Sequence, residues 1–105
     1  MNAAQFLDSI YPNWRSQHVD IVNHALRVYG PVLFAFKYQD RMLPSTMQIS
    51  EENSLTHKVG SINVETYHER HHNVLIEKPE DPLIYATKDS KYLYPPETVN
   101  IVKLQ

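Results

Sequence analysis

Histidines are concentrated in one short segment of this chain. Three of the six lie between His68 and His72, and His57 lies a short way upstream. Imidazole changes charge near neutral pH and is a common metal ligand, so this segment is the first place to look for chemistry. A first-row metal needs three or four ligands about 2.0–2.2 Å from one point. The candidate metal ligands are His57, His68, His71 and His72, with Glu65 or Glu69 as the base of a hydrolytic reaction.

The backbone geometry of this segment decides which of its histidines can point toward one common site. If the stretches from Ile62 to Tyr67 and from Asn73 to Lys78 pair as strands, the histidines lie at the tip of a hairpin. Adjacent strand residues point to opposite sides, so His71 and His72 could not both serve one site. A helical turn would instead bring His68, His71 and His72 onto one face. We expect the hairpin, where protonation of the imidazoles would create a pH-sensitive contact surface.

Tyrosine is the second unusual feature of the sequence. There are seven tyrosines, and three of them crowd into the last quarter of the chain beside two prolines. Tyrosine combines a large rigid surface with a polar tip and is enriched at interaction hot spots. The same rings could instead fill a small core, and both interpretations stay open at this point. The residues predicted to bind a partner are Tyr85, Tyr92, Tyr94, His68, Arg70 and His72.

Composition argues against several classes of function. Ten basic and twelve acidic residues give a formal net charge of −2, and the basic residues are scattered, whereas a nucleic-acid binder normally concentrates them. There is no cysteine for a disulfide or a thiolate metal site. Two glycines are too few for a phosphate-binding loop, so we expect no cofactor. Without a bilayer-length apolar run or a secretory signal, we expect a cytoplasmic protein, in the host cytosol if it is viral.

Two amphipathic segments begin the chain. Apolar residues from Ala3 to Tyr11 recur at helical spacing, and Asn2 with Gln5 has the form of a helix N-terminal capping box. A second apolar stripe runs from Trp14 to Tyr29, with Asn13 as its predicted cap, and ends at a Gly-Pro stop signal. We therefore predict that residues 2–29 are helical.

From Val32 onward the composition favours β-strands. The stretch from Val32 to Tyr38 is apolar on both faces, which is typical of a central strand. Short polar links favour hairpins over crossovers, so we predict a mainly antiparallel sheet and no further helix. Helices packed on one face of that sheet would give an α+β fold of one domain, with helices in 2–29 and a sheet of about five to six strands in 32–104. Weaker strand candidates are 46–50, 55–67 with a bulge at Gly60, 73–78, 83–87, 91–94 and 98–104.

These features favour a non-enzymatic protein–protein interaction domain. Such a domain would be a small inhibitor or accessory factor, of the kind that viruses and mobile elements encode, which binds and occludes a partner protein. The last strand, with Val99 and Ile101 on one face, could pair with a second copy or a partner if it lies at a sheet edge. The first alternative is the histidine-dependent metal-binding domain. The second is a small-ligand pocket lined by Trp14, Tyr29, Phe36 and Tyr38.

Overall fold

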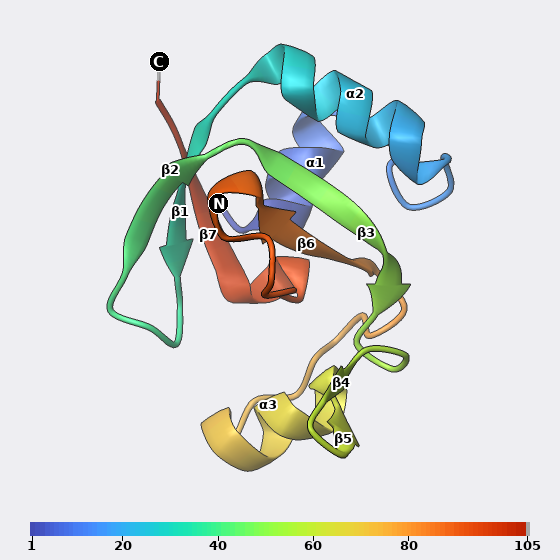
Figure 1. Cartoon of the computed structure of the whole chain (residues 1–105), viewed down its shortest axis with the longest axis vertical. Coiled ribbons are helices and arrows are strands. Elements are labelled where there is room, and N and C mark those ends of the chain that lie inside the picture. Colours follow the sequence, from blue (N-terminus) through green and yellow to red (C-terminus); the bar gives the residue numbers. More distant parts are fainter. Residues whose placement is uncertain (105) are drawn as a thin grey trace.

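The computed structural model of this protein describes residues 1–104, which form an α+β fold (Figure 1). The α+β class and the antiparallel strands predicted from the sequence are confirmed. The helices are α1 (Ala3–Ile10), α2 (Val19–Tyr29) and α3 (Val64–His72), with single 3-10 turns η1 (Thr87–Asp89) and η2 (Pro96–Thr98). The strands are β1 (Val32–Phe36), β2 (Met42–Ser45), β3 (Met47–Asn53), β4 (Lys58–Val59), β5 (Ile62–Asn63), β6 (Pro82–Ala86) and β7 (Val99–Lys103).

Helix α1 begins with the predicted capping box. The Asn2 side chain accepts a hydrogen bond from the Gln5 N–H, and the Gln5 side chain accepts one from the Asn2 N–H, both at 2.9 Å. Two N–H groups that the first turn leaves without helical partners are therefore satisfied. The inner face of α1 buries Ala3, Phe6 and Leu7 in the core.

Helix α2 begins five residues later than the sequence predicts. Its N-cap is His18, whose Nδ1 accepts a hydrogen bond from the Asp20 N–H at 3.2 Å, and not Asn13. Trp14 lies in the turn before the helix, where it is fully buried and donates from Nε1 to Asp8 at 2.8 Å. The predicted stop is confirmed, since Gly30 ends α2 with a positive φ of 93° that side chains with a Cβ rarely adopt.

The strands form three small antiparallel sheets, not one sheet of five to six strands. The first has the order β2-β1-β7, and the others are the pairs β3-β6 and β4-β5. Only Thr46 separates β2 from β3, so one bent strand carries the chain from the first sheet to the second (Figure 1). Tyr94 extends the second sheet through a bridge to Ile84, with two backbone hydrogen bonds of 2.9 Å.

The main core lies between the first two sheets and the inner faces of α1 and α2. Helix α2 is fixed to the second sheet by Asn23, a polar residue that is buried on its inner face. Its amide donates to the Ile49 carbonyl at 3.0 Å and accepts from the Ile49 N–H at 2.7 Å, so the side chain pairs with β3 as a strand would. The largest fully buried side chains of this core are Trp14, Phe6, Phe34, Leu7 and Leu26.

The segment after β3 contradicts the prediction of strands at 55–67 and 73–78. A short β4-β5 hairpin turns at Gly60 and is followed by α3, so the expectation of no helix after residue 31 is wrong. Asn63 caps α3 by accepting from the Thr66 N–H at 2.8 Å, and Asn73 ends it in the left-handed conformation. Helix α3 buries only Val64 and His68, which explains why apolar periodicity did not reveal it.

Strand β7 lies at the edge of the first sheet, as the edge-pairing prediction requires. Its outer side is partly covered by the N-terminal residues, because Ile101 donates to the Met1 carbonyl at 2.7 Å and Asn2 bridges Asn100. A second chain could add along this edge only by displacing residues 1 and 2 or by pairing beyond them. None of the helices in residues 1–104 has the length and apolar content to cross a bilayer.

Candidate functional site: an aromatic groove

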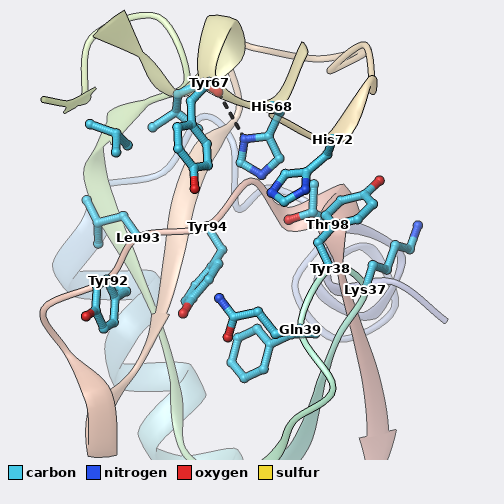
Figure 2. A pocket seen from close by; sticks show the side chains of 13 residues that line it. Lys37, Tyr38, Gln39, Tyr67, His68, His72, Tyr92, Leu93, Tyr94 and Thr98 are labelled. Carbon is cyan, nitrogen blue, oxygen red and sulfur yellow. Dashed lines mark hydrogen bonds between the residues drawn. The ribbon is translucent and has the colours of Figure 1, made fainter. Parts of the chain in front are cut away.

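A groove of about 320 Å³ lies between α3 and the ends of the two main sheets (Figure 2). Ring side chains make up most of its walls, and they come from three separate parts of the chain. We call it the aromatic groove and define it by six of its lining residues. These are Tyr38 from the loop after β1, Tyr67, His68 and His72 from α3, and Tyr92 and Tyr94 from the segment before η2.

Helix α3 is held beside the groove by a few hydrogen bonds. The Glu97 carboxylate accepts from the backbone N–H groups of Glu77 at 2.9 Å and Lys78 at 3.2 Å, which ties the segment after α3 to η2. At the other end, the buried Ser54 donates its N–H to the Pro79 carbonyl and accepts from the Glu65 N–H, both at 3.0 Å. These bonds set the distance between α3 and the second sheet.

Stacked rings close one end of the groove. The His72 ring lies parallel to Tyr38, with centroids 4.6 Å apart and an interplanar angle of 12°. His68 is four residues earlier and therefore lies on the same face of α3, with its centroid 5.4 Å from His72 and 6.1 Å from Tyr38. These contacts join α3 to the loop after β1, although the two segments are far apart in sequence.

Tyr94 connects the groove to the main core. Its ring packs against Phe36 at a centroid distance of 4.7 Å, and its backbone pairs with Ile84. Burial raises the pKa of the Tyr94 hydroxyl, an effect that a hydrogen bond with Gln39 only partly offsets. The phenol therefore stays protonated near neutral pH and can donate a hydrogen bond.

His68 is the buried polar residue of the groove. Its Nδ1 lies 3.0 Å from the Val64 carbonyl oxygen, which can only accept, so Nδ1 carries a proton. Burial lowers the pKa of His68 and nearby His72 lowers it further, outweighing the Val64 hydrogen bond and the attraction of Glu97. The ring is therefore neutral at pH 7, and its other nitrogen, Nε2, is an acceptor.

Positive charges border the groove. Lys37 is one of its lining residues, and Lys91 lies over the Tyr92 ring at 5.0 Å. Arg41 lies over the Phe36 ring at 5.4 Å and pairs with Asp89 at 2.7 Å. No aspartate or glutamate is among the lining residues found in the described part of the chain. The groove is thus aromatic inside and cationic at its border.

The structure brings together four of the six residues predicted to bind a partner. His68, His72, Tyr92 and Tyr94 line the groove, although they were predicted on a hairpin tip and a strand. Arg70 is exposed on α3 outside the groove lining. Tyr85 lies on β6 opposite Gln48 and is half-buried.

The four histidines considered as metal ligands are not brought to one point. His57 lies with Nδ1 2.9 Å from Glu52 Oε2, and His71 is exposed and stacks on Tyr67 at a centroid distance of 4.4 Å. A helical turn was the alternative expected to bring His68, His71 and His72 onto one face. These residues do lie on helix α3, but only His68 and His72 line the groove. Within residues 1–104, no three histidine, aspartate or glutamate side chains are arranged to hold a metal ion.

The small-ligand pocket predicted from the sequence is not formed, because the structure separates its four residues. Phe36 and Tyr38 line the aromatic groove. Trp14 is enclosed in the main core, and Tyr29 packs edge-on against Phe6 at 5.2 Å. Sequence reasoning missed Tyr67, which a prediction of α3 from its two asparagine caps would have placed next to His68.

No protein-family model matches this sequence, and a search of curated proteins found no similar protein. The function is therefore argued from the geometry and chemistry of the groove.

Proposed function

We propose that this protein is a non-enzymatic binding domain that docks a partner protein at the aromatic groove. The observation that carries the proposal is the gathering of six ring side chains from three segments around one groove. Several of these rings stay accessible, with Tyr38 37% and Tyr92 48% exposed. By occupying a partner's surface in this way, the domain would act as a small inhibitor or accessory factor.

The chemistry of the lining favours a protein partner. Tyrosines present large rigid surfaces with little conformational entropy to lose, and this is why they are frequent at binding hot spots. Tyr94 is packed on Phe36 of the main core, so part of the groove is supported by rigid structure. A prearranged aromatic site of this kind binds at a lower entropic cost than a mobile surface.

The same lining is less suited to catalysis. A hydroxyl or thiol nucleophile needs a neighbouring base to activate it. The Thr98 hydroxyl lines the groove, but it donates to the Pro95 carbonyl at 2.8 Å. The Nδ1 proton of His68 is used by the Val64 carbonyl, and no lining carboxylate orients the ring. These contacts support binding as the role of the site.

Selection of peptides from a random displayed library on the intact protein tests the proposal. Enriched peptides should bind the wild-type protein and should bind Tyr92→Ala and Tyr38→Ala at least about tenfold more weakly, as hot-spot truncations do. Both tyrosines are partly exposed, so the variants should fold. Circular dichroism and thermal melting would check this before the affinities are compared.

Tyr29→Ala is the matched control. Tyr29 lies on α2, away from the groove lining, and its exposed fraction of 39% is close to that of Tyr38. Peptide affinity should be unchanged in this variant. The proposal is wrong if no library peptide binds above background, or if the selected peptides bind all three variants as tightly as the wild type.

A further inference from the structure

His68 offers a hydrogen-bond acceptor to whatever enters the groove. Figure 2 shows its Nδ1 bonded to the Val64 carbonyl and its other nitrogen directed away from α3 into the space between the labelled side chains. No side-chain nitrogen or oxygen in residues 1–104 is fully buried without a partner. Since Nε2 makes no hydrogen bond to the described residues, it must be reached from the groove, where water or a ligand can donate to it.

The size of the groove limits its occupant. A volume of about 320 Å³ is at the lower end of the range of about 300–1,000 Å³ found for ligand pockets. It suits one aromatic side chain better than a helix or a long peptide. Tyrosine rings on several sides provide faces and edges against which such a ring can stack.

The charges around the groove argue against a cationic occupant. A lysine or arginine side chain would gain from aromatic faces, but those of Tyr92 and Phe36 already have Lys91 and Arg41 over them. Lys37 adds another positive charge to the lining, and no lining carboxylate would compensate for a further cation. The occupant should therefore carry no positive charge.

Hydrogen bonding separates the remaining candidates. A carboxylate and a purely apolar ring both lack a proton to donate. Either would displace water from Nε2 of His68 without replacing its hydrogen bond, which is unfavourable for a polar atom that becomes buried. The indole N–H of tryptophan can donate to Nε2 of His68, and because indole has no hydrogen-bond acceptor, it needs no donor from the groove in return.

From these observations, and resting on the function proposed above, we infer that the aromatic groove receives a tryptophan side chain of the partner protein. The indole ring packs against the groove tyrosines, and its N–H donates to Nε2 of His68. This contact is the anchor around which the rest of the interface forms.

Titration of the intact protein with N-acetyltryptophanamide and with its 1-methylindole analogue tests the inference. Nitrogen NMR of the imidazoles reports on Nε2 of His68, and proton shifts of the tyrosine rings report on groove occupancy. We expect the unmethylated probe to shift both sets of signals and the methylated probe to bind about tenfold more weakly, since methylation removes the donor and leaves Nε2 unpaired. This comparison uses only the wild-type protein.

His68→Phe and His71→Phe form a matched pair of variants. Phenylalanine keeps a ring at each position, but only position 68 lines the groove, since His71 is exposed outside it. In His68→Phe the affinity difference between the two probes should disappear, and in His71→Phe it should persist. Equal affinity of the two probes for the wild type, or no shift of the His68 and groove tyrosine signals, overturns the inference.

The outcomes separate this inference from the proposed function. If library peptides bind at the groove but the two indole probes bind equally, the protein-binding function stands and the tryptophan anchor is wrong. If the indole probes behave as expected but no library peptide binds, then His68 is an acceptor for a small indole ligand. The proposal that a partner protein docks at the groove is then wrong.

Discussion

The main core and the aromatic groove use ring side chains in opposite ways. In the main core, Phe6, Trp14 and Phe34 are fully buried between the helices and the two sheets. Around the groove, Tyr38 and Tyr92 remain 37% and 48% exposed. Phenylalanine has no polar atom, and the single N–H of Trp14 is satisfied by Asp8, so these rings can leave water completely. The rings of the groove carry hydroxyl and imidazole groups that need hydrogen-bond partners, so these rings stay at the boundary between the protein and water.

The two regions also differ in how they are held together. Strand pairing and a continuous apolar cluster stabilise the main core. Helix α3 depends on a smaller number of hydrogen bonds from Glu97 and Ser54, together with stacked rings. We therefore expect α3 to open locally at a lower free energy than the main core, as segments with few buried apolar contacts do.

Trp14→Ala, in the main core, should lower the free energy of unfolding by a larger amount than any substitution in the groove. The substitution leaves a cavity in the main core and removes the partner of Asp8, so the free energy of unfolding should fall by about 3–5 kcal/mol. Urea denaturation followed by circular dichroism measures this change. A loss below about 1 kcal/mol would mean that the main core is not the chief source of stability.

Glu97→Ala should have an intermediate effect that is confined to α3. Removing two charge-assisted hydrogen bonds should reduce the local stability of the segment by about 1–3 kcal/mol. Hydrogen exchange should therefore quicken at the amides of α3 and of Glu77 and Lys78, with little change in β1. Glu80→Ala, at an exposed position of the same region, is the control. Equal acceleration throughout the protein would contradict separate opening of α3.

Acidification should destabilise the wild-type protein through His68. Because the pKa of His68 is lowered in the folded state, the unfolded state binds more protons at a pH between the two pKa values. The free energy of unfolding should therefore fall as the pH drops below the unfolded value, and this contribution should level off below the folded value. Once protonated, His68 would be repelled by His72, and among its charged neighbours only Glu97 would attract it.

Denaturation curves of the wild type and His68→Phe across this pH range measure the effect. The variant should lose part of the pH dependence that the wild type shows. Identical pH dependence in the wild type and His68→Phe would show that His68 does not contribute. The contact between His57 and Glu52 is present in every variant and cancels in the comparison.

Tyr92→Ala should have the smallest effect on stability. Half of the side chain is already exposed, so the free energy of unfolding should change by less than about 0.5 kcal/mol. Phe34→Ala, at a fully buried ring, should cost about 3–5 kcal/mol under the same conditions. If Tyr92→Ala lowered the free energy of unfolding as much as Phe34→Ala does, the groove tyrosines would be part of the stabilising core. The main core and the groove would then not differ in how they use their rings.

Local signals predicted much of the fold. The Asn2 capping box, the stop at Gly30 and the strands near residues 32–36, 82–86 and 99–103 are all readable because neighbouring residues determine them. The strand β2, which includes Pro44, was missed, as was α3, whose sequence has no apolar stripe. The two asparagines at the ends of α3 were the remaining signal for it.

Local patterns along the chain were enough to predict an α+β protein with mainly antiparallel strands and with histidine and tyrosine as its distinctive side chains. These properties follow from composition, periodicity and caps, which act over a few residues. The packing of distant segments is what brings Tyr38, His68 and Tyr94 into one groove and makes His68 present an acceptor there. Contacts between segments so far apart depend on how the sheets and α3 pack, and no local pattern encodes that packing.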